Sequence, residues 1–141
     1  MNSIDRLFEA AKAAQARAYA PYSGFPVGAA LLADDGAIFS GCNVENAAYP
    51  NGLCAESGAI AAMVIAGERR ITDVLVVGGA GGPLTPCGAC RQRLFEFSND
   101  ETRVHLADAA GPVEVLLLRE LLPRAFGPHD LAIHQRDDNT R

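Results

Sequence analysis

The sequence predicts an α/β protein whose helices cover a mixed sheet. Helical and strand patterns alternate after an initial strand hairpin, and a later segment, residues 71–77, is a nearly continuous run of β-branched and apolar residues. A strand of that composition is buried on both faces, as in the centre of a helix-covered sheet. The 141 residues are enough for one domain. We expect it to span residues 1–134 and to precede a polar, frayed tail at 135–141.

The N-terminal third predicts a helix and then a hairpin. Ser3 suits the N-cap of a helix over residues 3–19, because its apolar side chains recur at helical spacing. Pro and Gly in residues 20–24 end this helix. Strands at 27–33 and 37–41 flank a tight Asp-Asp-Gly turn and form the hairpin.

The middle of the chain predicts a loop, a helix and the central strand. Residues 42–53 are rich in Asn, Pro and Gly and are expected to be loop. A helix should begin at Cys54 and end at Gly67, a usual C-terminal stop. After the strand at 71–77 comes the Gly-rich run 78–83. This run lacks the Gly-Lys-Ser/Thr ending of a phosphate-binding loop, so we interpret it as a flexible loop at the edge of a site.

The last third predicts one more helix and a second pair of strands. The helix covers residues 87–97, and the strands at 103–107 and 113–117 flank an Ala-Ala-Gly-Pro turn. A short helical turn at 120–122 precedes Pro123. With the hairpin and the central strand, this pair completes the strands of the predicted sheet.

The composition argues against nucleic-acid and membrane partners. The formal net charge is -5 and Lys and Arg form no run, so the chain lacks the positive surface that a polynucleotide requires. No apolar stretch approaches the roughly 18 residues that span a membrane, and the N-terminus has no apolar signal core. We therefore expect a cytoplasmic protein, whose cysteines serve as ligands and not as disulfides.

Three cysteines and a glutamate form the main candidate site. Cys54 and Glu56 belong to a Cys-Ala-Glu motif, and Cys87 and Cys90 belong to a Pro-Cys-Gly-Ala-Cys motif. Both motifs fall at predicted helix N-termini, where unpaired N–H groups and the helix dipole favour thiolates. Three thiolates on one zinc leave its fourth tetrahedral position open to water, as in catalytic sites. Such a zinc makes hydroxide available near neutral pH, and Glu56 is placed to move the protons.

Other arrangements of these residues remain open. Cys42 as a fourth ligand would close the zinc site and make it structural. It lies at a strand end without a paired ligand, and a structural site gives no reason for Glu56, so the open site is favoured. The ordinary interpretation of Cys42 is a small buried thiol, and that of Glu56 alone is a first-turn helix acid. A chain without metal is the remaining alternative.

Five segments together resemble a known family. They are Tyr22-Ser23-Gly24-Phe25-Pro26-Val27-Gly28-Ala29-Ala30, Asn43-Val44-Glu45-Asn46, Cys54-Ala55-Glu56, Pro86-Cys87-Gly88-Ala89-Cys90-Arg91-Gln92 and Leu121-Leu122-Pro123-Arg124-Ala125-Phe126-Gly127-Pro128. In this order, over residues 19–131, they resemble the small, homotetrameric, zinc-dependent cytidine deaminases of pyrimidine salvage. The combination is specific, whereas either cysteine motif alone would not be.

The resemblance implies a three-layer α/β/α sandwich with a mixed five-stranded sheet and one zinc per subunit. It implies hydrolytic deamination of cytidine and 2′-deoxycytidine, in a homotetramer whose sites are shared between subunits. By the same resemblance Asn43 and Glu45 hold the ribose hydroxyls, and the Glu45 carboxylate repels a 5′-phosphate. The further substrate contacts that it implies are Phe25 on the base, Tyr49 near the sugar, Ala55, and Phe126 from a neighbouring subunit.

Several of these assignments have alternatives. Phe25 and Phe126 could serve core or interface packing, and Asn43 and Glu45 could be a turn residue and a solvated acid. A deaminase of a cytosine-bearing nucleoside analogue such as blasticidin S shares the Cys-Ala-Glu motif, but the segments around Asn43 and Phe126 favour cytidine. A zinc-stabilised binding module without catalysis is the alternative from another class. The acidic composition disfavours a deaminase that edits RNA or DNA.

Ser57 directly follows Cys-Ala-Glu, where many members of the resembled family carry an Arg that offsets the thiolate charge. A zinc with three thiolates is formally anionic, so the charge needs another partner. Two helix N-termini and Arg91 are the candidates. We expect Ser57→Arg to retain zinc and to change the deamination rate only modestly, as measured by zinc content and an ultraviolet assay. A large loss of zinc in this variant would contradict the compensation.

Overall fold

The protein forms a mixed sheet with helices on both faces. The computed structural model describes residues 1–79 and 82–131. The strands of the described part are β1 (Val27–Ala33), β2 (Ile38–Cys42), β3 (Ile71–Gly78), β4 (Arg103–Asp108) and β5 (Gly111–Leu117). Their order is β2-β1-β3-β4-β5, and β3 and β4 run parallel while the other neighbours are antiparallel. The predicted α/β class with a mixed five-stranded sheet is confirmed.

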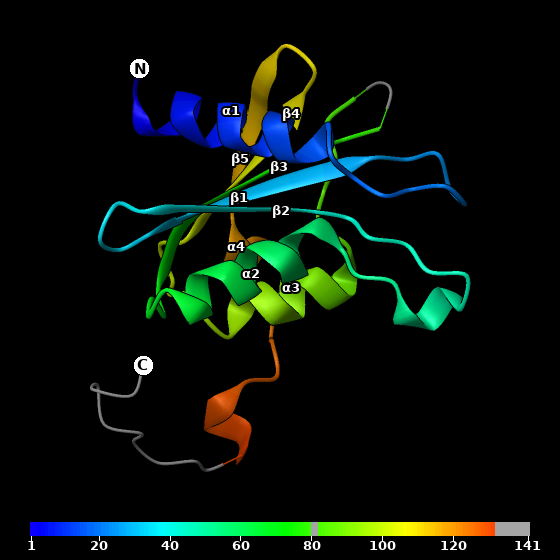
Figure 1. The fold of residues 1–141 in the computed structure, drawn as a ribbon. Coiled ribbons are helices and arrows are strands. Elements are labelled where there is room, and N and C mark those ends of the chain that lie inside the picture. Colours follow the sequence, from blue (N-terminus) through cyan, green and yellow to red (C-terminus); the bar gives the residue numbers. More distant parts are fainter. Residues whose placement is uncertain (80–81, 132–141) are drawn as a thin grey trace.

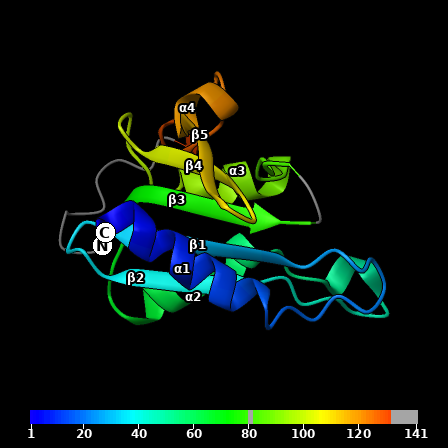
Figure 2. The ribbon, with the colours of Figure 1, turned by 90° about the horizontal axis from the view of Figure 1, so that it is seen from above.

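The helices make the outer two of three layers. Helix α1 (Ser3–Gln15) crosses one face of the sheet, and α2 (Ala55–Ile65) and α3 (Gly88–Phe95) lie side by side on the other (Figure 1, Figure 2). The short helix α4 (Leu118–Leu121) follows β5. Each face has its own apolar core: Leu7, Ala11, Ala30, Leu75, Val77 and Ala107 under α1, and a larger one that includes Leu31, Met63, Val74, Leu94 and Val104 under α2 and α3. Both faces of the central strands are thus covered, as the apolar pattern predicts.

Helix α1 begins and ends differently from the prediction. Asn2, not Ser3, is its N-cap: the Asn2 side chain accepts a hydrogen bond from the Asp5 N–H at 2.8 Å, and Asp5 accepts one from the Asn2 N–H. Such a capping box satisfies two otherwise unpaired donors. The helix ends at Gln15 and not near Tyr19, because the Tyr19 backbone is extended and pairs with the segment around Val44.

Two short 3₁₀ helices were not predicted. One, Tyr49–Asn51, lies inside the expected loop 42–53, and the other is Pro128–Leu131. Among the described residues, every helix is too short or too polar to cross a membrane. The expected tail at 135–141, the boundary at residue 134 and residues 80–81 of the Gly-rich run lie outside the described residues.

Gly41 sets the distance between β2 and helix α2. A Cβ at this position would overlap the carbonyl oxygen of Ala55 and approach the Ala59 backbone. The first turn of α2 therefore lies directly on the sheet, which only a residue without a side chain allows. This contact holds the start of α2, and with it Cys54, against the sheet.

A network of side-chain hydrogen bonds centred on the buried Asp73 joins β3 to β4. The Asp73 carboxylate accepts hydrogen bonds from Arg103 Nε at 2.9 Å and from Arg103 Nη2 at 3.2 Å, and His105 Nε2 lies 2.8 Å from Asp73 Oδ1. Burial opposes the ionisation of Asp73, but the hydrogen bonds from His105 and Arg103 outweigh it and lower its pKa from 3.8 to about 2. The ionised carboxylate is therefore a stabilising partner in the fold.

We expect Asp73→Asn to lower the free energy of unfolding at pH 7 by about 2 kcal/mol. Because the folded-state pKa is depressed, the stabilisation is present above pH 4 and is lost as the pH falls towards 2. Urea unfolding of both proteins across this range should therefore show a difference that shrinks with acidification. Any metal lost at acid pH affects both proteins alike. A difference that is independent of pH would contradict the role of the ionised carboxylate.

Candidate metal centre and adjoining cavity

The three predicted cysteine ligands meet where two helices begin. Cys54 is the N-cap residue of α2 and Cys87 is the N-cap residue of α3, each with extended backbone angles and no capping hydrogen bond from its thiol. Cys90 follows within the first turn of α3 and is fully buried. The side chains at both N-termini are therefore free to face a shared ligand, close to the positive ends of two helix dipoles.

The sulfur geometry fits a tetrahedral metal ion. The Sγ atoms of Cys54, Cys87 and Cys90 all lie within 4.8 Å of one another. The Cys54 and Cys87 sulfurs are 3.9 Å apart, close to the spacing of about 3.8 Å that two sulfurs at tetrahedral angles on one zinc would have. Among the described residues, Cys42 and the acidic side chains stand outside this group. The donor set therefore matches a three-thiolate zinc with an open position and not the closed four-cysteine alternative.

The surroundings of the three thiols raise the pKa of two of them and lower that of the third. Burial raises the pKa of Cys54, and burial together with the neighbouring Glu56 carboxylate raises the pKa of Cys90. Burial also opposes the ionisation of Cys87, but hydrogen bonds from Cys90 and Cys54 outweigh it and lower its pKa. Ionised together, these groups would repel one another, and a divalent cation between the sulfurs would offset that repulsion.

Arg93, and not Arg91, contacts the sulfurs. Arg93 Nη1 donates to Cys90 Sγ at 3.6 Å. The Arg91 guanidinium instead donates to the carbonyl oxygens of Pro86 at 2.8 Å and Leu121 at 3.1 Å. The contact with a sulfur that was expected of Arg91 is thus made by Arg93, while two of the Arg91 donors are directed to backbone carbonyls. Ser57 Oγ is buried and has no hydrogen-bond partner among the described residues.

A cavity of about 400 Å³ opens beside the cysteines. Its lining includes every substrate contact that the resemblance implied within one chain: Phe25, Asn43, Glu45, Tyr49 and Ala55, together with Cys54, Glu56 and Cys87. The Glu56 side chain lies in the first turn of α2 and only 3% of the residue is exposed. The thiols of Cys54 and Cys87 and the buried Glu56 carboxylate therefore form one part of the lining. Asn43 and Glu45 form a second, polar part, called the polar edge below.

The polar edge is tied to a neighbouring turn. Asn43 Oδ1 accepts a hydrogen bond from the Val27 N–H at 2.8 Å, and Asn43 Nδ2 donates to the Phe25 carbonyl at 2.9 Å. Glu45 accepts from the hydroxyl and N–H of Ser23 and from the N–H of Tyr22. These hydrogen bonds, chiefly the one from the Ser23 hydroxyl, lower the pKa of Glu45. Ser23 had no role in the sequence interpretation, because its partner is distant along the chain and no local pattern marks the pairing.

Phe25 also lines the cavity, next to Asn43. Its ring covers Gly79, where a Cβ would overlap the ring atoms and where the backbone has a φ of 67°. Gly79 belongs to the Gly-rich run, so the described part of that run borders a residue of the cavity as expected for a loop at the edge of a site. Phe25 is 43% exposed and Tyr49 is 75% exposed. Both rings are therefore accessible at the mouth.

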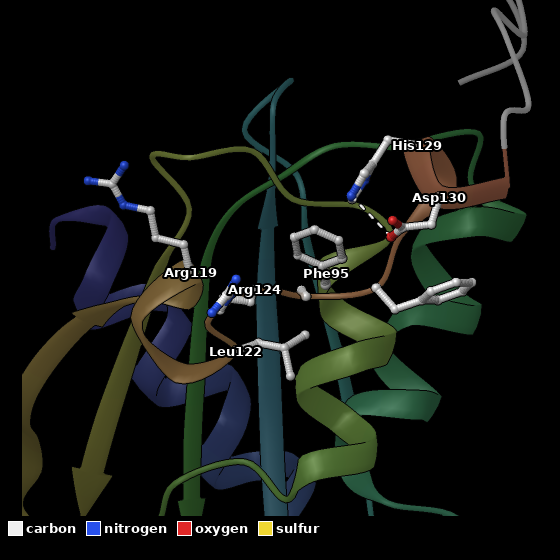
Figure 3. A pocket seen from close by; sticks show the side chains of 8 residues that line it. Phe95, Arg119, Leu122, Arg124, His129 and Asp130 are labelled. Atoms are coloured by element: carbon white, nitrogen blue, oxygen red, sulfur yellow. Dashed lines mark ion pairs between the residues drawn. The ribbon is translucent and has the colours of Figure 1, made fainter.

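Phe126 lies elsewhere. It lines a second, open pocket of about 540 Å³ at the C-terminal end of α3, with Phe95, Arg124 and the His129–Asp130 pair (Figure 3). Phe126 is 58% exposed, and its carbonyl accepts a hydrogen bond from Gln92 Nε2 at 2.9 Å. Within one chain it does not reach the cavity beside the cysteines, so its contact with a neighbouring subunit stays a prediction.

Comparison with known proteins agrees with this site. The family model described as the cytidine and deoxycytidylate deaminase zinc-binding region matches residues 1–106. A cytidine deaminase of Sporosarcina psychrophila is 46% identical over 129 residues, which are 92% of this chain and 95% of that protein. A cytidine deaminase of Mycobacterium tuberculosis is 45% identical over 123 residues, which are 87% of this chain and 89% of that protein.

Solved structures show the same similarity. The cytidine deaminase of Burkholderia pseudomallei superposes with a TM-score of 0.81 at 48% identity, over 86% of this chain and 98% of that chain. The cytidine deaminase of M. tuberculosis gives a TM-score of 0.76 at 43% identity, over 87% of this chain and 96% of that chain. The family model spans all three clustered cysteines, and the chain therefore belongs to the cytidine and deoxycytidylate deaminase family that carries this zinc-binding region.

Proposed function

We propose that the protein hydrolyses cytidine and 2′-deoxycytidine to uridine and 2′-deoxyuridine, with release of ammonia, in pyrimidine salvage. One observation carries the proposal: a single cavity joins the clustered thiols and the buried Glu56 to the polar pair Asn43 and Glu45. A reacting base and a sugar have different chemistry, and the cavity lining offers both a group of thiols with a carboxylate and a polar pair. The relatives whose sequences cover nearly the whole chain are themselves called cytidine deaminases.

Cys54, Cys87 and Cys90 would hold one zinc per subunit. When bound, zinc lowers the pKa of water at its open position, so that a nucleophile is available near neutral pH. Cys54 and Cys87 would bind the zinc from two helix N-termini, whose dipoles favour the thiolates.

Glu56 is the proposed proton carrier. Its carboxylate lines the cavity next to the cysteines and is shielded from solvent. It takes one proton from the water that adds to C4 of cytosine and delivers it to N3. It then takes the remaining proton from the new C4 hydroxyl and delivers it to the amino group as the C4–N4 bond breaks. Ammonia leaves and the C4 carbonyl of the uracil product remains.

Asn43 and Glu45 are the proposed contacts for the sugar hydroxyls, Phe25 for the base, and Tyr49 and Ala55 for the remaining nucleoside surface. All five line the cavity. Because Glu45 is held ionised by its hydrogen bonds, it repels a 5′-phosphate and favours a nucleoside over a nucleotide.

We further propose a homotetramer in which Phe126 completes the site of a neighbouring subunit. The exposed ring of Phe126, outside its own chain's cavity, supports this arrangement. A cytoplasmic location agrees with four cysteines that are free thiols, since that compartment keeps them reduced. The net charge of -5 agrees with a small-molecule substrate and not a nucleic acid.

We expect Glu56→Gln to keep zinc and to lower kcat for cytidine by about 10²–10⁴-fold, because proton transfer loses its carrier. The measurement is ultraviolet loss of cytidine together with zinc content. Glu101→Gln, at an exposed glutamate outside the cavity, is the matched control and should match the wild type.

A second assay, of ammonia release, distinguishes the candidate functions. Ammonia release is compared for cytidine, 2′-deoxycytidine, dCMP and blasticidin S. A zinc-loaded wild type that is inactive on all of them would overturn the deaminase and favour a binding module. Activity on blasticidin S alone would favour the nucleoside-analogue enzyme.

We also expect Arg93→Gln to release zinc at about tenfold lower chelator concentration than the wild type, because the hydrogen bond and positive charge at Cys90 are removed. Competition with a chromogenic chelator at constant pH measures this, with thermal unfolding recorded in parallel. Arg91→Gln is the matched control on the same helix and should release zinc only at a higher chelator concentration than Arg93→Gln does. The reverse order of the two variants would show that Arg91 compensates the thiolates after all.

A further inference from the structure

The hydrogen bonds of Glu45 leave its carboxylate with little free capacity. An ionised carboxylate has about four acceptor positions, two on each oxygen. Oε1 accepts from the Tyr22 N–H at 2.9 Å and the Ser23 N–H at 3.0 Å, so both of its positions are occupied. Oε2 accepts from the Ser23 hydroxyl. A single acceptor position on Oε2 therefore remains for a ligand in the cavity.

The Ser23 hydroxyl can only donate a hydrogen bond to the Glu45 carboxylate and cannot accept one from it. Ser23 Oγ accepts a hydrogen bond from the Phe25 N–H at 3.0 Å. Its single proton is then available for the carboxylate, which has no proton to give in return. Ser23 thus connects the backbone of Phe25 to the carboxylate of Glu45, and both of these residues line the cavity.

The turn that carries Ser23 is shaped for this contact. Gly24 has a φ of 64°, a conformation that favours glycine, and its N–H donates to the Ala20 carbonyl at 2.9 Å. The turn directs two successive N–H groups and the serine hydroxyl at one carboxylate. Since charged hydrogen bonds of this kind are stronger than neutral ones, they hold Glu45 in one orientation.

Asn43 is restrained by the same segment. Its Oδ1 and Nδ2 each make one hydrogen bond to the backbone of residues 25–27, which leaves one acceptor and one donor position. The polar edge of the cavity therefore offers a sugar a small, fixed set of positions. On the Glu45 side this set is one acceptor, so it suits one hydroxyl donor.

We propose that Ser23 is a positioning residue for the nucleoside site: it aims the last acceptor position of Glu45 into the cavity, where it binds one sugar hydroxyl. This inference rests on the proposed function, and it adds a prediction of sugar specificity. A nucleoside without that hydroxyl gains nothing from Ser23. Ser23 itself lines a neighbouring pocket with Tyr22 and Tyr49 and is absent from the lining of the cavity beside the cysteines.

The test compares Ser23→Ala with the wild type on cytidine, 2′-deoxycytidine, 3′-deoxycytidine and 2′,3′-dideoxycytidine. We expect kcat/KM for cytidine to fall about tenfold, mainly through KM, because a hydrogen bond to a charged group is lost. The fall in kcat/KM should vanish for the monodeoxy nucleoside that lacks the hydroxyl bound by Glu45 and persist for the other. The nucleoside without an effect therefore identifies that hydroxyl as 2′ or 3′. For 2′,3′-dideoxycytidine the two proteins should agree within about twofold, and zinc content should be unchanged.

Three further variants separate positioning from general damage. Ser23→Thr keeps the hydroxyl and should restore most of the cytidine activity. Ser40→Ala, at an exposed serine of β2, is the matched control and should match the wild type. In a Glu45→Gln background, Ser23→Ala should cost much less than it does alone, because the charged partner is already gone.

Equal losses on all four nucleosides would overturn the proposal, since they would mark a structural role. Wild-type kinetics of Ser23→Ala on cytidine would overturn it as well. If the zinc-loaded wild type converts none of the nucleosides, the proposed function itself fails, and this inference fails with it.

Discussion

The rest of the site depends on the convergence of two helix N-termini on one face of the sheet. Helices α2 and α3 begin side by side there, and their first turns bring three sulfurs within 4.8 Å of one another. The convergence requires close packing, which Gly41 permits by leaving room for the first turn of α2 on β2. It also places Glu56 against the sulfurs, since a residue in the first turn of α2 shares the environment of its N-cap.

This arrangement concentrates negative charge, and the fold provides for it. Three thiols and a carboxylate in a partly buried site repel one another when ionised, so a divalent cation and nearby positive groups are needed. Two helix dipoles contribute from the backbone, and Arg93 contributes a guanidinium in contact with the buried Cys90. The neighbouring Arg91 instead anchors α3 to the carbonyls of Pro86 and Leu121, which is a structural task. Arg91 and Arg93 belong to the same helix, but one side chain contacts backbone carbonyls and the other contacts a sulfur.

The polar edge of the cavity is constrained by hydrogen bonds that occupy most of the donor and acceptor positions of Asn43 and Glu45. Asn43 and Glu45 lie in the chain after β2, and the turn before β1 holds both by backbone donors and acceptors. The antiparallel pairing of β1 and β2 brings these two segments together at one end of the hairpin. The positions of Asn43 and Glu45 at the cavity therefore depend on the strand register as much as on the two residues themselves.

Local chemistry made much of this protein predictable from the sequence by itself. The strands follow from β-branched and apolar runs, and the clustered cysteines with Glu56 follow from two short motifs at helix starts. Contacts between distant segments were not predictable in the same way. Tyr19 leaves its helix to pair with Val44, Ser23 binds Glu45, and Arg93 takes the place expected for Arg91. Periodicity and motifs report how a residue relates to its neighbours along the chain. Which carboxylate a serine meets, and which arginine reaches a sulfur, were decided only by the packing of the tertiary structure.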